Sequence, residues 1–263
     1  MRFVVGERGA FAYTGARPLD PALPSVLFVH GAGNDHSVWA LQSRYFAHHG
    51  HNVIAIDLPG HGRSAGPPQA SVEAIAAWLA DAMATIGLAR YAVVGHSLGA
   101  LSALALAALQ PTRVERLALL GPAAPMTVSD ALLDAAAHDQ PRAAALITGW
   151  SHSTPRQLGG NPVPGVWMMG QARRLLERTA PGVLHIDLRA CHRYDDAAAA
   201  AAGVRCPVLF MLGERDVMAP PRQVAALQAA LPNARTLVLP GAGHAMMAEE
   251  PDAVLDALRD FLR

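Results

Sequence analysis

Ser97 stands in a turn whose sequence is typical of a catalytic nucleophile. It is the centre of a Gly-His-Ser-Leu-Gly motif at residues 95–99, between an apolar run at residues 91–94 and strong helix formers at residues 101–109. A strand, a sharp turn and a helix in that order expose the serine hydroxyl at the apex of a strained turn. A glycine-rich turn without chemistry is the alternative, and the flanking elements favour the nucleophile.

Asp216 and His244 are the expected partners of this serine. A serine hydroxyl needs a general base at neutral pH, and the base needs a group that orients it. Behind such a turn, the acid precedes the histidine along the chain. Asp216 and His244 follow that order, each in a loop directly after an expected strand. The segment after the strand at residues 116–120 could also carry the acid, but residues 121–125 contain none. Glu214 is the alternative acid.

The composition favours a globular α/β protein without a nucleic-acid or membrane surface. Of the 263 residues, 52% are hydrophobic and 16% are charged, and the formal net charge is zero. No apolar stretch approaches the roughly 20 residues that span a bilayer. The amino end lacks the apolar core of a signal peptide, so we expect a cytoplasmic protein. The sequence indicates no oligomeric state.

The sequence lacks the patterns that hold a structural zinc or anchor several common cofactors. All 21 basic residues are arginine, which removes Schiff-base chemistry, a pyridoxal phosphate anchor and a phosphate-loop lysine. The two cysteines, Cys191 and Cys206, belong to no Cys-x-x-Cys or Cys/His pattern with metal-ligand spacing. We therefore expect neither a metal nor a cofactor.

Alternating apolar strands and helices predict the framework that positions these residues. Strands are expected at residues 25–29, 52–57, 91–94, 116–120, 207–212 and 236–239, after a hairpin at residues 2–5 and 10–14. Apolar strands separated by helices indicate an α/β fold with a doubly wound, mostly parallel sheet. Ligands of such sheets bind at the carboxyl ends of the strands, where Ser97 and residues 30–33 are expected.

The alternation of expected strands and helices is interrupted between residues 122 and 186, where no strand is expected. Helical pieces around residues 130–137, 143–150 and 166–179 are interrupted by proline and glycine. We interpret residues 122–186 as an inserted helical cap on a core of residues 1–121 and 187–263. One helix, at about residues 187–202, is expected to return to the core.

Several large side chains of the cap could line a pocket. The candidates are Trp150, His152, Trp167 and Met168 from the cap and Trp39 from the core. For each, simple packing is the alternative. The cap segment carries five arginines and four acids, a balance that favours neither an anionic nor a cationic substrate. A modest, largely apolar acyl or alcohol group is the expected occupant.

The ordered motifs resemble those of the α/β-hydrolase family over nearly the whole chain. The matching segments are residues 30–31, 57–64, 95–99, 213–216 and 243–244. The resemblance implies Ser97 as nucleophile, His244 as general base and then acid, and Asp216 as its partner. It also implies an oxyanion hole formed by the backbone N–H groups of Ala32 and Leu98.

Carboxylic ester hydrolysis is the reaction that the resemblance favours, with a small ester-like molecule and water as the reaction partners. Hydrolysis of lactones, or of C–C bonds in meta-cleavage products, is the alternative. Members that cleave C–C bonds tend to carry a longer glycine-rich stretch than residues 32–35 after His-Gly. Members that open epoxides or displace halide carry an aspartate in place of Ser97. A ligand receptor that hydrolyses very slowly or not at all is a further alternative, since fold alone does not decide function.

Overall fold

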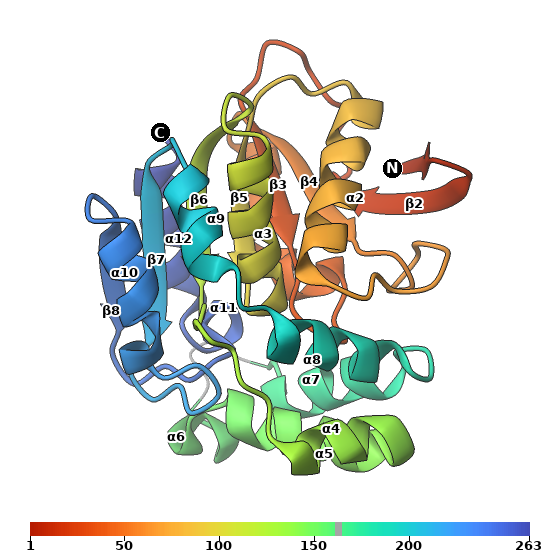
Figure 1. The fold of residues 1–263 in the computed structure, drawn as a ribbon, viewed down its shortest axis with the longest axis vertical. Coiled ribbons are helices and arrows are strands. Elements are labelled where there is room, and N and C mark those ends of the chain that lie inside the picture. Colours follow the sequence, from red (N-terminus) through yellow and green to blue (C-terminus); the bar gives the residue numbers. More distant parts are fainter. Residues whose placement is uncertain (161–164) are drawn as a thin grey trace.

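Within residues 1–160 and 165–263, which the computed structural model describes, an eight-stranded sheet lies between helices on both faces (Figure 1). The strands are arranged in the order β1-β2-β4-β3-β5-β6-β7-β8. Their bounds are β1 (Arg2–Val5), β2 (Arg8–Tyr13), β3 (Ser25–Val29), β4 (Asn52–Asp57), β5 (Tyr91–His96), β6 (Val114–Leu120), β7 (Val208–Gly213) and β8 (Arg235–Leu239). Each expected strand is therefore present, with its ends within two residues of the expected ones.

The pairing of the strands brings the loops at their carboxyl ends together. β1 and β2 form an antiparallel hairpin that joins β4 through β2, and the six strands from β4 to β8 in the sheet order are parallel. Val29 at the end of β3 pairs with Gly95 in β5, so the segments that follow these two strands emerge side by side. Gly213 pairs with Leu239 in the same way, at the ends of β7 and β8. The expected doubly wound, mostly parallel sheet is confirmed.

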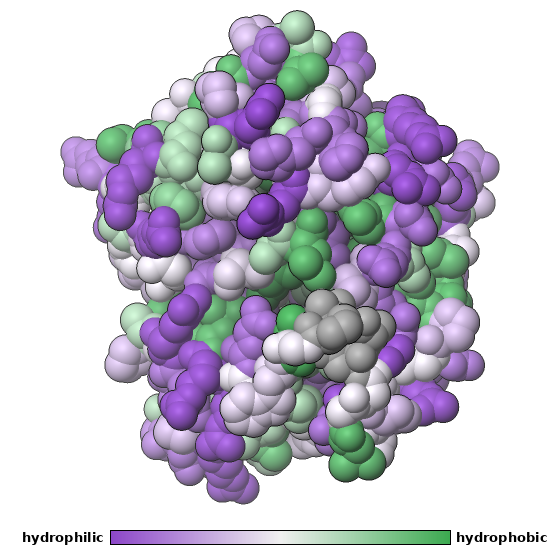
Figure 2. All heavy atoms as spheres, turned by 180° about the vertical axis from the view of Figure 1, so that it is seen from behind, coloured by the Kyte–Doolittle hydropathy of each residue, from purple (hydrophilic) through white to green (hydrophobic). Residues whose placement is uncertain are grey.

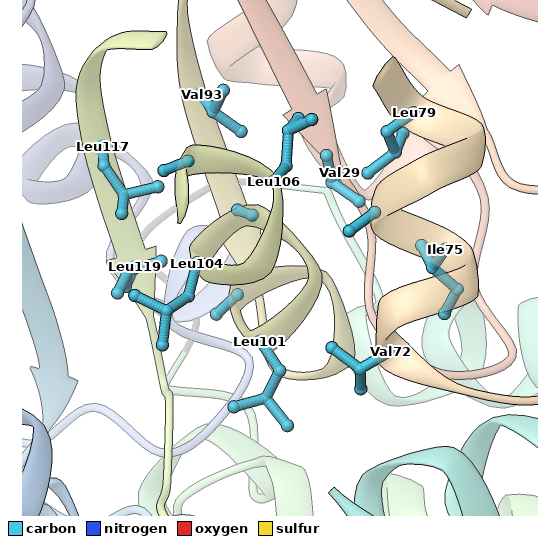
Figure 3. Packing of buried hydrophobic residues seen from close by; sticks show 14 of the residues in the cluster. Val29, Val72, Ile75, Leu79, Val93, Leu101, Leu104, Leu106, Leu117 and Leu119 are labelled. Atoms are coloured by element: carbon cyan, nitrogen blue, oxygen red, sulfur yellow. The ribbon is translucent and has the colours of Figure 1, made fainter. Parts of the chain in front are cut away.

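Helices cover both faces of the sheet with their apolar sides. On one face lie α2 (Val72–Ile86), α3 (Leu98–Leu109), α9 (Ala197–Gly203) and α10 (Ala225–Ala230), and on the other α1 (Ala40–His48), α11 (Met246–Glu249) and α12 (Pro251–Phe261). Figure 3 shows Leu101 of α3 near Val72 of α2, and Leu104 near Leu119 of β6. Burying each such side chain stabilises the fold by about 1.5–3 kcal/mol. α3 is apolar on nearly all sides because it packs against the sheet, α2 and α9.

A separate layer of helices lies at the carboxyl ends of the strands (Figure 1). Its members are α4 (Asp130–His138), α5 (Gln140–Ser151), α6 (Thr154–Gln157), α7 (Met168–Glu177) and α8 (Val183–Arg193). A small core of their own is shared by α4, α5, α7 and α8 and includes Leu132, Leu176 and Leu188. No helix in the described part of the chain is both long and apolar enough to cross a membrane.

The prediction of a single helix at residues 187–202 is wrong. Two helices, α8 and α9, take its place, and α8 begins at Val183. The break falls at Tyr194, whose backbone is extended (φ −76°, ψ 109°) and whose ring is buried in the main core. Burial of this ring against the core outweighs the helix propensity of the alanine-rich segment that follows.

Candidate active site

Ser97 occupies a strained turn between β5 and α3. Its φ of 54° and ψ of −117° lie in a region that residues other than glycine rarely adopt. Its N–H donates to the Leu120 carbonyl at 2.9 Å. A Cβ at Gly95 would lie 2.2 Å from the Gly99 carbonyl oxygen, and one at Gly99 would lie 2.4 Å from the Val29 carbonyl oxygen. Both glycines are therefore required, because α3 starts directly against the strands.

Asp216 and His244 meet at the ends of β7 and β8. His244 Nδ1 lies 2.7 Å from Asp216 Oδ2, and both side chains are buried. Asp216 Oδ1 also accepts from the N–H groups of Met218 and Ala219, at 2.9 and 2.8 Å. Burial acts to raise the pKa of Asp216, but His244 and the hydrogen bonds outweigh it, and the pKa is lowered. The ionised carboxylate only accepts, so Nδ1 of His244 carries the proton and its Nε2 is free to act as a base.

Glu214, the alternative acid, lies elsewhere. Its Oε2 accepts from the N–H of Gly241 at 2.8 Å, in an exposed part of the loop. The structure thus brings Asp216, and not Glu214, to His244.

The two expected oxyanion-hole residues lie on the segments that follow β3 and β5. A Cβ at Gly31 would approach the Ser97 Cβ to 3.3 Å, so the segment after β3 runs directly beside Ser97. Leu98 opens α3, where the first N–H groups have no partner within the helix. In the described part of the chain the N–H of Ala32 makes no hydrogen bond either. Both N–H groups are thus available to a developing negative charge.

The loop after β3 is held by a buried ion pair that sequence reasoning missed. Asp187 Oδ2, on α8, accepts from the N–H of Gly33 at 2.8 Å and lies 2.7 Å from His61 Nε2. Thr179 Oγ1 donates to the Gly33 carbonyl at 2.6 Å. Burial acts to lower the pKa of His61, but Asp187 outweighs it, and the pKa is raised. No local pattern signals this contact, because 154 residues separate Gly33 from Asp187.

Glu249 is a second buried group near the site whose contacts the sequence did not indicate. This fully buried carboxylate accepts from the N–H of Gly243 at 2.9 Å through Oε1. Its Oε2 accepts from the Ser153 hydroxyl at 2.7 Å and from the Ser153 N–H at 3.1 Å. It therefore ties the loop that carries His244 to the segment between α5 and α6.

One acidic cluster has the donor types of a metal site. The ligand atoms of Asp35, His36 and Asp57 lie within 4.8 Å of one another. Asp57 already accepts from the His36 ring and backbone and from the N–H of Arg63, and Asp35 pairs with Arg178 at 2.7 Å. The ligand atoms of these groups are thus already engaged in hydrogen bonds and an ion pair within the protein.

A cavity of about 600 Å³ joins the candidate residues. It is lined by Ser97, His244 and Ala32 on the sheet side and by residues of α4, α5, α7 and α8 on the other. Three of the expected pocket residues, Trp150, His152 and Met168, line it. On the face of the molecule shown in Figure 2, hydrophobic residues gather in a hollow near the middle of the view.

The structure places the other two expected pocket residues away from the cavity. Trp39 is 0% exposed and packs against Phe28, with ring centroids 5.3 Å apart, in the core beside the sheet. Trp167 is 77% exposed, and its indole lies where a Cβ at Gly170 would be. Trp39 thus belongs to core packing and Trp167 to the surface of the helical layer.

Two histidines beside the site are buried in the neutral form. His30 Nδ1–H donates to the Gly31 carbonyl, and its Nε2 accepts from the N–H of Leu58. His96 Nε2–H donates to the His244 carbonyl at 2.9 Å. Burial lowers the pKa of His30 to about 4 and that of His96 to about 3. Both rings fix backbone near the site, as a structural histidine does.

These two histidines are expected to make stability fall in mild acid. Their folded pKa lies below the unfolded value of about 6.5, so the unfolded chain binds their protons first as the pH drops. Their contribution to the free energy of unfolding is complete above about pH 6.5. It is lost as the pH falls to about 4 for His30 and to about 3 for His96. In urea unfolding, His96→Gln should reduce the slope of unfolding free energy against pH by up to about 1.4 kcal/mol per unit. Equal slopes for the two proteins would contradict this explanation.

The fold and this arrangement define an α/β hydrolase, and the family comparison agrees. Residues 26–257 match the sequence model of the family described as "Alpha/beta hydrolase family". The chain belongs to that family, which confirms the resemblance expected from the motifs.

Among the relatives, the "Putative carbamate hydrolase RutD" of Klebsiella pneumoniae subsp. pneumoniae is 30% identical over 260 residues, which cover 92% of each chain. The sn-1-specific diacylglycerol lipase ABHD11 of Mus musculus is 27% identical, over 92% of this chain and 82% of that one. Among solved structures, the enol-lactonase from Burkholderia xenovorans LB400 has a TM-score of 0.86 and 25% identity, with 100% of this chain and 99% of that chain covered. The names of these proteins differ in substrate, so they define the family rather than the substrate.

Proposed function

We propose that this chain is a serine esterase that hydrolyses small carboxylic esters through an acyl-enzyme on Ser97. The observation that carries the proposal is the buried 2.7 Å contact between His244 Nδ1 and Asp216 Oδ2, at a cavity that Ser97 also lines. A base oriented by an ionised acid, at the same cavity as an accessible serine, is the arrangement that acyl transfer requires.

Each step of the reaction uses a group of the site. His244 Nε2 takes the proton of Ser97 as its Oγ attacks the ester carbonyl, and the oxyanion is held by the N–H groups of Ala32 and Leu98. His244 then gives its proton to the departing alcohol. Water, activated by the same ring, attacks the acyl-enzyme and releases the acid. Each oxyanion donor contributes about 10²–10³-fold to the rate.

We further propose that residues 122–186 act as a cap on a core of residues 1–121 and 187–263. Residues of α4, α5 and α7 line the cavity opposite Ser97, which supports this division. The small core of these helices also includes Leu184 and Leu188 of α8. The proposed boundary at residue 187 falls within α8, which begins four residues earlier, at Val183. The expected cytoplasmic location stays a prediction.

Lactone and carbamate hydrolysis are second candidates, because they need the same nucleophile, base and oxyanion donors. They are supported by the similarity to an enol-lactonase, at a TM-score of 0.86, and to a protein named as a putative carbamate hydrolase, at 30% identity. C–C bond hydrolysis and a slow ligand receptor on the same fold are the remaining alternatives.

A panel of substrates tests this proposal. The purified protein is assayed with p-nitrophenyl acetate, butyrate, hexanoate and octanoate, beside a six-carbon lactone, a p-nitrophenyl carbamate and a ring-cleavage diketone. We expect ester turnover with kcat/KM of at least about 10⁴ M⁻¹s⁻¹ for the preferred chain length. Turnover of the carbamate, the lactone or the diketone without turnover of any ester would overturn the ester assignment. Turnover of none would favour the receptor.

A further inference from the structure

His152 is a buried polar side chain in the cavity that the proposed reaction does not use. It lines the cavity together with Ser97 and His244, at the end of α5. Its Nδ1 lies 3.0 Å from the Thr148 carbonyl oxygen, and a carbonyl oxygen only accepts, so Nδ1 carries the hydrogen. Burial lowers the pKa of His152 despite this hydrogen bond, so the ring is neutral at pH 7. Its Nε2 is therefore a hydrogen-bond acceptor.

Nε2 of His152 has no partner within the described residues. The hydrogen bonds of this ring to Thr148 and Ser151 all use Nδ1. The residue lines the cavity, and Nε2 is the ring nitrogen left to bond a ligand there. A polar atom in a largely apolar cavity is a group that fixes the orientation of a ligand.

The position of His152 relative to the catalytic loop is fixed. The Ser151 carbonyl accepts from the N–H of Ala245 at 2.8 Å, directly after His244. On the other side, Glu249 joins Ser153 to Gly243. His152 is thus held beside the loop that carries His244, the base that would protonate the departing alcohol in the proposed reaction.

The remainder of the cavity carries no full charge among its described lining residues. None of them is an arginine, an aspartate or a glutamate, and the chain has no lysine. Aliphatic side chains of the helical layer dominate the far side: Leu132, Ile147, Leu175, Leu176 and Leu188. A charged substrate would lose its hydration there without gaining an ionic partner.

We propose that the site selects uncharged esters or lactones with an apolar acyl group and an O–H or N–H donor on the leaving-group side, which His152 Nε2 accepts. This inference rests on the proposed function and names its substrate class. It assigns His152 as a specificity-determining residue, because its acceptor would be left unpaired by a substrate that lacks the donor.

Three hexanoate esters of similar size test the proposal: the 2-hydroxyethyl ester, the n-propyl ester and the carboxymethyl ester. Release of hexanoic acid is followed for each in a pH-stat at pH 7.5. For the wild type we expect kcat/KM for the hydroxyethyl ester to exceed that for the propyl ester by about five- to tenfold. The carboxymethyl ester should be at least about tenfold poorer than the hydroxyethyl ester.

Variants assign the preference to His152. His152→Leu should reduce the ratio of hydroxyethyl to propyl ester to about one, and His152→Gln, which offers an amide oxygen, should restore part of it. Gln171→Leu, which removes a polar side chain on α7 at the same cavity, should keep the wild-type ratio. Each ratio is measured on one preparation, so a loss of folded protein does not affect it.

Failure of this inference is distinguishable from failure of the proposed function. Turnover of the propyl ester with a wild-type ratio of one, or with the same ratio in His152→Leu, overturns the inference and leaves the esterase intact. Preferred turnover of the carboxymethyl ester also overturns it. Absence of turnover with all esters overturns the proposed function and the inference with it.

Discussion

Ser97→Ala is expected to lower kcat for p-nitrophenyl ester hydrolysis by at least about 10⁴-fold. Without its hydroxyl the site cannot form an acyl-enzyme, and only the oxyanion donors and substrate binding remain. Alanine adopts the positive φ of this turn at a cost similar to serine, so the fold should persist. Initial rates and circular dichroism of the two proteins provide the measurement.

Ser102→Ala is the matched control for this variant. Ser102 lies one turn further along α3, and its hydroxyl donates to the Leu98 carbonyl at 2.8 Å, outside the cavity. We expect the kcat of Ser102→Ala to stay within about twofold of the wild type, because this substitution leaves the groups of the site unchanged. Near-normal turnover in Ser97→Ala, or an equal loss in both variants, would be incompatible with Ser97 as the nucleophile.

Asp216→Asn is expected to lower kcat by about 10³–10⁴-fold. The carboxylate holds the proton of His244 on Nδ1 and stabilises the charged ring that forms when Ser97 is deprotonated. An amide at this position stabilises that charge far less and no longer dictates the tautomer. The test is kcat between pH 6 and pH 9, with folding followed by circular dichroism.

Glu214→Gln separates the two acids of the same loop. Glu214 accepts from the N–H of Gly241 and makes no contact with His244, so its replacement should change kcat by less than about threefold. A large loss in Glu214→Gln with an active Asp216→Asn would reverse the assignment of the acid.

The strands and the nucleophile turn could be predicted from the sequence because their signals are local. The motif around Ser97 specifies a strand, a sharp turn and a helix within a few residues. The other strands can be recognised from their short, continuous apolar composition. The candidate partners Asp216 and His244 were found from their place after strands, since parallel strands bring their carboxyl ends to one edge.

Other parts of the site were not predictable because they depend on tertiary packing. Trp39 has the same local pattern whether it faces a ligand or Phe28, and only the packed core decides between them. Asp187 and Glu249 hold loops through contacts that leave no periodic trace in the sequence. The break between α8 and α9 likewise comes from tertiary packing. Burial of the Tyr194 ring in the main core outweighs the strong helix propensity of the alanine-rich segment that follows.

Peptide mapping after reaction with a fluorophosphonate tests the central claim most directly. A fluorophosphonate modifies a serine only where a base and an oxyanion hole activate it, so it reports the machinery independently of the substrate. We predict one adduct per chain, on the peptide that contains Ser97, and none in Ser97→Ala. An adduct on another residue, or ester turnover in a protein whose Ser97 is never modified, would contradict the account.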